Sequence, residues 1–457
     1  MSELAGRLGT ETRTLIALLI ALPATLWLAD QIELNLGMAL LLWAIIAVRT
    51  ILHRNVWVGR ATVAALALWA IILPYTTESG GGLIDDATLA LAYAVFALGL
   101  NIIVGFAGLL DLGYVAFFAL GSLTAGWFMS GFFANAGKGG EGAHILVADQ
   151  FTTLPGIHMN FLLVLVAAVI ITTIAGVLIG LPTLRLRGDY IAIVTLAFGE
   201  IIGRITINGD EIKLGDIPLI GGALDSVFGA DAHLTAGRQG ITPVDKLDLP
   251  GLDPFTALEL RPWYFVALAL VFIALFVNYR LRDSRLGRAW IALREDEVAA
   301  TSMGVPLVKT KLMAYGTGAA FGGISGAYLA SYLNTVNADQ FQFAFSIFVL
   351  AMVILGGLGS IEGVMLGAIV LSLINNRLIP DVFNSYPSKV GLDFDLTELS
   401  FGIFGFLLVI MMVLRPEGLI PERRRKIELT EGVGTGDTAG LGAAAGPADE
   451  ALFEARA

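Results

Sequence analysis

The chain has 457 residues, of which 56% are hydrophobic and only 15% charged, and its mean hydropathy is +0.79. Soluble domains carry about 25% charged residues, so this composition excludes an ordinary soluble enzyme and a disordered chain. The net charge of -11 argues against a nucleic-acid partner, and the absence of cysteine excludes disulfides and thiolate chemistry.

Apolar runs recur along the chain and predict an all-α, polytopic membrane protein. A transmembrane helix needs about 20 mainly apolar residues, and several runs are shorter than this, so we expect about 10–12 transmembrane or re-entrant helices. In chain order the runs lie over residues 15–29, 36–48, 61–75, 87–105, 116–130, 161–181, 191–207, 263–279, 312–332, 343–358, 364–378 and 401–414.

The first apolar run follows Arg7 and Arg13 and in that respect resembles a signal peptide. It ends at Trp27-Leu-Ala-Asp30 without a clear small-x-small cleavage site, so we expect a retained anchor. Residues 1–86 are therefore predicted to form N-terminal membrane helices, which precede a core over residues 87–421.

Positively charged residues indicate which loops face the cytoplasm. When the N-terminus is placed inside, most Lys and Arg residues fall in alternate loops, including the long loop 280–311. The positive-inside rule then predicts an N-in, C-in protein with an even number of crossings. The polar segments 131–160 and 208–262 become outer loops, and residues 422–457 become a cytoplasmic, disordered tail. The acidic second outer loop fits either a solvated surface or a docking site for a soluble partner.

Signals for catalysis are scarce. His53, His144, His158 and His233 show no metal-ligand spacing, and Gly137-Lys-Gly139 lacks the Ser or Thr that a phosphate-binding loop requires. We therefore expect no catalytic residues, no metal and no cofactor. Active transport by this chain would have to be driven by a partner or by an ion gradient.

A few ionisable residues lie within or beside apolar runs, where charge is costly and often marks a transport pathway. They are Asp111, Glu200, Arg204, Glu362 and Arg377. Glu200 and Arg204 are four residues apart on one helical face, so we expect them to neutralise each other. No relay of acids and histidines accompanies them, which disfavours a proton-coupled mechanism.

Two Gly-interrupted apolar segments, 98–113 and 353–363, each place an acid beside glycines. Broken helices are a pointer to a transport site because unwound backbone can line a cavity. Close helix packing through small residues is the alternative. If the segments line a pathway, its candidate residues are Asn101, Gly105, Gly108, Asp111, Gly357, Gly359 and Glu362.

Four segments resemble the LivM-type permease subunits of the branched-chain amino acid ABC transporter family. In chain order they are Gly99-Leu-Asn-Ile-Ile-Val-Gly105, the segment 184–200, the segment 286–300, and Arg415-Pro-Glu-Gly-Leu419. The resemblance extends over residues 87–421 and implies the ABC importer permease fold.

The resemblance also implies a function and a set of partners. Such a permease imports branched-chain or other hydrophobic amino acids across the bacterial plasma (inner) membrane. Its expected partners are two ATP-binding subunits, a second permease chain, a periplasmic substrate-binding protein, the amino acid substrate and the lipid bilayer. Permeases for urea or short amides share much of this pattern. A stand-alone secondary transporter or channel is the alternative from another class.

ABC permeases carry a cytoplasmic Glu-Ala-Ala motif that is followed, after three residues, by Gly. Here Ala299, Ala300 and Gly304 keep the spacing, whereas Val298 replaces the Glu and Glu297 lies one place earlier. The resemblance implies that Glu297, Ala299, Ala300 and Gly304 couple the permease to its ATPase. From the residues alone, the segment is a basic cytoplasmic loop.

Overall fold

The computed structural model describes residues 68–75, 82–134, 142–147, 153–183, 190–217, 221–229, 232–249, 254–256, 258–383, 399–414 and 418–420. The first two predicted apolar runs, residues 61–67 of the third, and the predicted tail 422–457 lie outside these residues.

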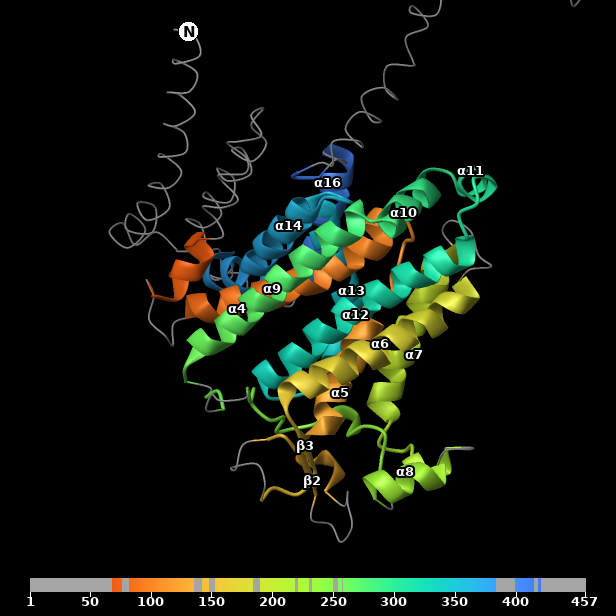
Figure 1. The fold of residues 1–457 in the computed structure, drawn as a ribbon. Helices are drawn as coiled ribbons and strands as arrows, with labels where there is room; N and C mark the ends of the chain where they lie inside the picture. The colour runs from red at the N-terminus through yellow and green to blue at the C-terminus, as the bar shows by residue number, and fades with distance from the viewer. Residues whose placement is uncertain are drawn as a thin grey trace, which may run out of the picture.

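The described chain is mostly helical and forms a bundle of inclined helices (Figure 1). The main helices are α4 (Gly82–Leu100), α5 (Val115–Phe128), α6 (Phe161–Thr183), α7 (Tyr190–Asn208), α9 (Leu260–Asp283), α12 (Leu307–Leu333), α13 (Phe343–Gly356), α14 (Ile361–Leu373) and α16 (Ser400–Leu414). Shorter elements are α8 (Gly221–Phe228), α10 (Arg285–Glu295), α11 (Glu297–Ser302), the π-helical η1 (Asn101–Phe106) and η7 (Ile374–Phe383), and the 3-10 turns η2 (Gly131–Phe133), η4 (Leu214–Asp216), η5 (Gly237–Gln239) and η6 (Ala338–Phe341).

Five described helical stretches are long and apolar enough to cross a membrane, which confirms an all-α, polytopic membrane protein. They are Gly82–Phe106, Phe161–Thr183, Tyr190–Asn208, Leu260–Asp283 and Ile361–Pro380. Shorter apolar helices lie at Val115–Phe128, Phe343–Gly356 and Gly402–Leu414.

Helix α4 lies at the centre of the bundle, packed against α9, α12 and α14. Beyond its N-terminal end, which carries Asp85 and Asp86, α4 is mainly apolar on all sides, so this part has no face suited to water and is enclosed by other helices. Its Phe96 ring stacks on Tyr114 at 4.6 Å, and the Tyr114 hydroxyl donates to the Gly318 carbonyl of α12 at 2.8 Å. Helices α6, α7 and α9 lie at the periphery and expose one face each.

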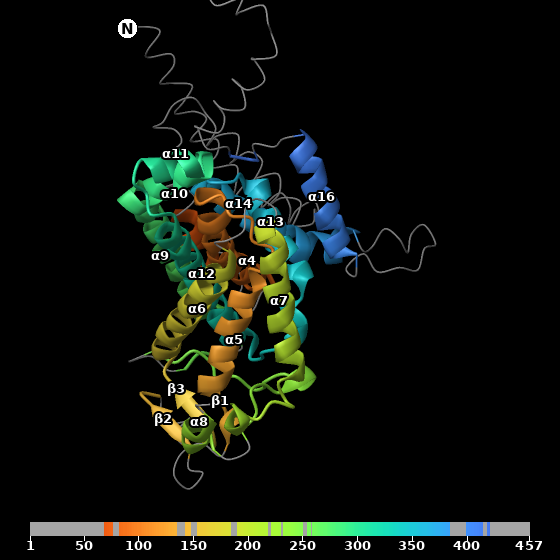
Figure 2. The ribbon, with the colours of Figure 1, turned by 90° about the vertical axis from the view of Figure 1, so that its right-hand side faces the viewer.

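A small sheet lies in the predicted outer segment 131–160 and just before it. Strand β3 (Ile157–Met159) pairs antiparallel with β1 (Met129–Ser130) and parallel with β2 (Ala143–Ile145). Figures 1 and 2 show this sheet and α8 at one end of the bundle and α10 and α11 at the other. The two predicted outer loops therefore lie opposite the loop 280–311, as alternation of the loops requires.

Candidate functional site

Helices α10 and α11 form a hairpin between α9 and α12, and two local caps define it. The Ser284 hydroxyl accepts a hydrogen bond from the Gly287 N–H at 3.1 Å and begins α10. The Asp296 carboxylate accepts from the N–H groups of Val298 and Ala299 at 2.8 and 3.0 Å and begins α11. Ser and Asp are preferred at this position because their oxygens satisfy the first free N–H groups of a helix.

Three side chains fasten the hairpin to the bundle. Trp290 is fully buried, and its Nε1 donates to the Thr310 carbonyl of α12 at 2.8 Å. The Lys311 ammonium of α12 pairs with the Glu297 carboxylate of α11. Arg294 Nη1 donates to the Gly105 carbonyl of η1 at 2.6 Å. The hairpin is thus attached to both α12 and the broken end of α4.

The four predicted coupling residues divide between two surfaces. Glu297 is half-buried against Lys311, and Ala300 is buried, so both face the bundle. Ala299 and Gly304 are exposed. Gly304 has a φ of +87°, and a Cβ atom placed on it would meet nothing within 4 Å.

Two further residues belong to the exposed surface of the hairpin. Val298 is 68% exposed and Met303 is 86% exposed, although both are apolar. The sequence motif does not identify them, since Val298 stands where the family has Glu. The sequence signal that could have found Val298 is the apolar residue at this position of the motif. Exposed apolar groups beside an exposed glycine are typical of a contact surface.

The two Gly-interrupted segments meet inside the bundle. Asn101 Oδ1 accepts a hydrogen bond from the Gly359 N–H at 2.9 Å, and both residues are buried. A Cβ atom placed on Gly105 would lie 2.7 Å from the Gly359 nitrogen. One placed on Gly418 would overlap the Cα of Gly357. The structure therefore shows the close packing through glycine that the second interpretation of these segments requires.

The other candidate pathway residues also make contacts within the chain. Asp111 is buried and accepts from the Gly113 N–H at 2.9 Å. Glu362 accepts from the Tyr279 hydroxyl at 2.7 Å, and Gly108 lies against the side chain of Arg294. A pathway lined by these residues remains a prediction.

Replacing Asn101 with leucine should lower the thermal stability of the purified protein. The Gly359 N–H would lose its acceptor in a buried site, which costs about 1–3 kcal/mol. The measurement is the melting temperature in detergent. Asn375→Leu serves as the control because Asn375 donates only to the neighbouring Asn376 and is part-buried. Equal melting temperatures for Asn101→Leu and wild type would contradict the prediction.

The charged residues predicted within apolar runs have different surroundings. Arg377 Nη1 pairs with Asp86 Oδ2 at 2.9 Å. Glu200 and Arg204 both lie on the exposed face of α7. In the part of the chain that the structure describes, no ion pair or hydrogen bond joins these two side chains, so the prediction that they neutralise each other is wrong.

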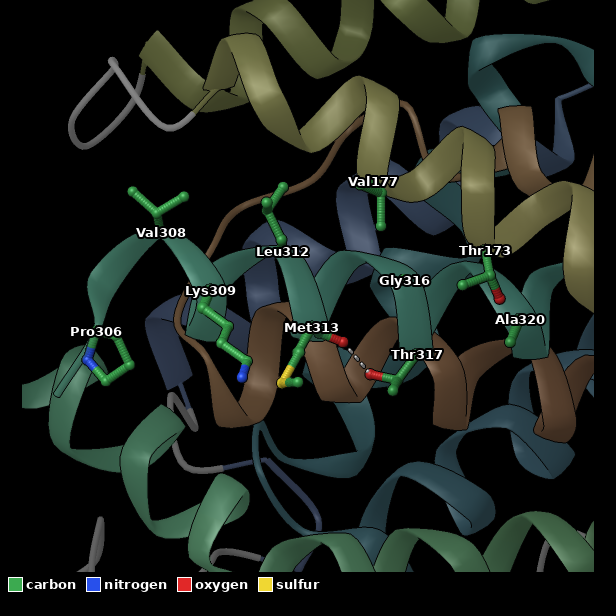
Figure 3. Close-up of a pocket in the computed structure, with 10 residues that line it drawn as sticks. All are labelled: Thr173, Val177, Pro306, Val308, Lys309, Leu312, Met313, Gly316, Thr317 and Ala320. Carbon is green, nitrogen blue, oxygen red and sulfur yellow. Dashed lines mark hydrogen bonds between the residues drawn. The ribbon is translucent and has the colours of Figure 1, made fainter.

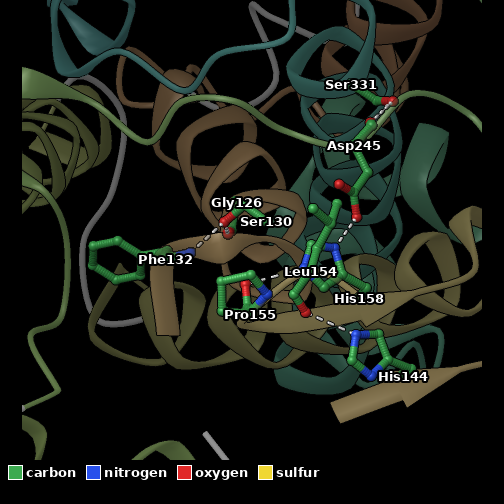
Figure 4. A network of polar contacts seen from close by, with 9 residues as sticks. All are labelled: Gly126, Ser130, Phe132, His144, Leu154, Pro155, His158, Asp245 and Ser331. Atoms are coloured by element: carbon green, nitrogen blue, oxygen red, sulfur yellow. Dashed lines mark hydrogen bonds and ion pairs between the residues drawn. The ribbon is translucent and has the colours of Figure 1, made fainter. Parts of the chain in front are cut away.

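A polar network attaches the small sheet to the C-terminal end of α12 (Figure 4). His158 Nδ1 lies 2.6 Å from Asp245 Oδ2. The Asp245 N–H donates to the Met129 carbonyl at 2.6 Å, and the Ser331 hydroxyl donates to the Asp245 carbonyl at 2.7 Å. Burial lowers the pKa of His158, but the hydrogen bond and charge of Asp245 outweigh burial and hold that pKa above its ordinary value.

The end of the bundle that carries the small sheet should lose stability as the pH rises. Because the folded pKa of His158 is raised, its pairing with Asp245 stabilises the fold fully below about pH 6.5, the unfolded value, and this contribution is lost as the pH rises through the folded pKa. Melting temperatures measured from about pH 6 to about pH 9 should therefore fall, and the fall should be smaller in His158→Gln. His144→Gln is the control, since the His144 ring stacks on His158 and its Nε2 hydrogen-bonds to the Leu154 carbonyl at 2.9 Å rather than to Asp245. Identical pH profiles for wild type and His158→Gln would contradict this assignment.

An open groove of about 660 Å³ runs between α6 and α12 (Figure 3). Apart from Lys309 at one end and two threonines, its lining is apolar. Its members are Thr173, Val177, Pro306, Val308, Lys309, Leu312, Met313, Gly316, Thr317 and Ala320. None of the predicted site residues contributes to it. This lining is suited to hydrocarbon rather than to a polar solute.

Comparisons with known proteins agree with the motifs. Residues 82–412 match the family described as the branched-chain amino acid transport system / permease component. The high-affinity branched-chain amino acid transport system permease protein LivM of Escherichia coli K12 is 37% identical over 82% of this chain and 78% of its own length. A probable branched-chain amino acid transport permease protein LivM of Methanocaldococcus jannaschii is 25% identical over 72% of this chain and 91% of its own.

A second type of permease is related more distantly. The high-affinity branched-chain amino acid transport system permease protein LivH of Escherichia coli K12 is 24% identical over 36% of this chain and 48% of its own length. No solved structure matches the chain. On the evidence of the family match and of the LivM relatives, the chain belongs to the family of branched-chain amino acid transport permeases.

Proposed function

We propose that the chain is the membrane-spanning permease subunit of an ATP-driven importer for branched-chain or other hydrophobic amino acids. Family membership and the names of the LivM relatives support the substrate class. The structural observation behind the ATP-driven part is the α10–α11 hairpin, which displays Val298 and Met303 at one end of the bundle. An exposed apolar surface on a short capped hairpin fits the groove of a soluble partner.

The partners in this proposal are two ATP-binding subunits, a second permease chain and a periplasmic substrate-binding protein. ATP hydrolysis is assigned to the partners because the sequence lacks a phosphate-binding loop. The partial similarity to LivH supports a second permease of related fold. We place the protein in the bacterial inner membrane with both termini in the cytoplasm, as the positive-inside rule predicts.

The contacts of the hairpin suggest how it passes on a movement of the ATP-binding subunits. A push on the exposed side of α11 reaches α12 through the Glu297–Lys311 pair and through Trp290. The same push reaches η1 through Arg294 and the Gly105 carbonyl. Because packed interiors transmit strain rather than absorb it, both helices should move with the hairpin. Ala299 and Gly304 would lie in the partner's groove, and Glu297 and Ala300 would hold α11 to the bundle.

The test is affinity purification of the tagged chain from its native membrane in mild detergent, followed by mass spectrometry of the proteins that accompany it. We expect two ATP-binding proteins and a second permease, and ATP-dependent leucine uptake after reconstitution with the binding protein. Val298→Asp with Met303→Asp should release the ATP-binding proteins and retain the second permease. A chain that purifies alone and transports without ATP would overturn the proposal in favour of a secondary transporter or channel.

A further inference from the structure

Helix α7 exposes a stripe of mixed polarity, although it is long and apolar enough to cross the membrane. Its exposed positions recur every three or four residues and therefore lie on one face. Figure 2 shows α7 along the outside of the bundle. From the inner end to the outer end, this α7 stripe consists of Tyr190, Ile193, Ala197, Glu200, Arg204 and Asn208.

The neighbouring helix α6 provides the contrast. Its exposed face is entirely aliphatic, and α6 also borders the apolar groove of Figure 3. This pattern is that of a helix face covered by lipid chains. The α6 stripe consists of Leu162, Val166, Ile170, Ile174 and Leu178. The same bundle thus has one face built for lipid and another, on α7, that displays a carboxylate and a guanidinium.

The two charges of α7 lie far from water if the helix spans the membrane. Glu200 is ten residues from Tyr190 and eight from Asn208, or about 15 Å and about 12 Å at a rise of 1.5 Å per residue. A charge at this depth requires a water-filled cavity or a charged partner. Arg204 lies one turn nearer the outer end.

Helix α7 cannot rotate about its axis to move this stripe to another direction, because the opposite face of the helix is tightly packed. The Leu112 N–H donates to the Thr195 hydroxyl at 3.1 Å. A Cβ atom placed on Gly199 would lie 3.0 Å from the Cα of Gly113. These contacts fix the rotation of α7 about its axis and therefore the direction in which Glu200 and Arg204 point.

We propose that Glu200 and Arg204 bind the ammonium and carboxylate groups of the amino acid as it passes along α7. This inference rests on the proposed function. Side chains four residues apart on a helix are neighbours, yet within the described residues these two do not pair with each other. An amino acid zwitterion carries both complementary charges on one carbon atom. The site would recognise the ammonium and carboxylate groups that all amino acids share and would not discriminate between their side chains.

The absence of cysteine from the sequence permits a direct test in the reconstituted complex. Ala197→Cys places a thiol on the α7 stripe one turn from Glu200 and leaves both charges intact. We expect a charged, membrane-impermeant thiosulfonate to label Cys at this position from water. Leucine-loaded binding protein with ATP should slow labelling relative to unloaded binding protein, since an amino acid held by Glu200 and Arg204 would cover the thiol one turn away. Ile174→Cys on the α6 stripe is the matched control and should not react.

The same complex distinguishes binding of substrate from pairing with the second permease. Glu200→Gln and Arg204→Gln should each abolish the leucine protection at position 197 and lower leucine uptake about tenfold, while both permeases and the ATPase activity are retained. Ile201→Gln is the control for a polar change at the same depth and should leave uptake unchanged. An unreactive Cys at 197, protection that survives both substitutions, or loss of the second permease from either variant would overturn the inference. Failure of the wild-type complex to import any amino acid would instead overturn the proposed function.

Discussion

Gly304→Val is expected to abolish amino acid uptake and to leave membrane insertion intact. Gly304 has a φ of +87°, which a β-branched residue adopts only at a cost of order 1–3 kcal/mol. A Cβ atom at this position would meet nothing within 4 Å in this chain, so the added Cβ does not clash with the bundle. Uptake of labelled leucine and the amount of chain in the membrane fraction are the two measurements.

Gly304→Asn separates the two reasons for a glycine at this position. Asn tolerates a positive φ far better than Val but adds a side chain to the exposed surface. If a partner's groove encloses Gly304, both variants should lose uptake and the ATP-binding subunits should no longer co-purify. Recovery of uptake in the Asn variant would show that only the backbone conformation matters. Preserved uptake in the Val variant would reject a coupling role for Gly304.

Glu297→Ala should destabilise the hairpin strongly and lower uptake. The Lys311 side chain is 3% exposed and pairs with Glu297, so the substitution leaves a buried ammonium without this carboxylate. Removing one partner of a buried pair costs about 3–5 kcal/mol, and we expect the lower end because the Glu297 side chain is 35% exposed. The measurements are the melting temperature in detergent and the ATPase activity of the purified complex.

A double variant serves as the control for this pair. Glu297→Gln combined with Lys311→Met keeps the volume of both side chains and removes both charges. Because replacing a whole buried pair by neutral groups of similar shape is often nearly neutral, the double variant should recover most of the lost stability. If it is as unstable as Glu297→Ala, the ion pair is not the reason for the effect.

Sequence patterns predicted the helices well where an apolar run fills a whole span. The predicted run 191–207 corresponds to α7, Tyr190–Asn208, and the run 161–181 to α6, Phe161–Thr183. Such agreement is expected because length and hydropathy alone decide whether a segment crosses a membrane. The small three-stranded sheet was not predicted, since strands of two or three residues have too few positions for an alternating pattern.

Contacts between distant segments were beyond sequence reasoning. Asn101 and Gly359 are 258 residues apart, and nothing local to either segment indicates their hydrogen bond. The expected pairing of Glu200 with Arg204 failed for a related reason. Spacing on a helix says which side chains are neighbours, but what surrounds the helix decides whether they pair. The anchoring of Arg294 on the Gly105 carbonyl likewise depends on the position of α10 against η1.

The enclosure of α4 has a consequence for the order in which the protein assembles. Helix α4 precedes α9, α12 and α14, which surround it in the finished fold, so they are synthesised only after it has left the ribosome. Until then it must persist in the bilayer as a separate helix, as in two-stage assembly of membrane proteins. In keeping with this requirement, α4 and η1 together are apolar enough to cross a membrane although they are almost wholly buried in the finished bundle. The composition of α4 suits the lipid in which it first resides, whereas its glycine contacts suit the neighbours that arrive later.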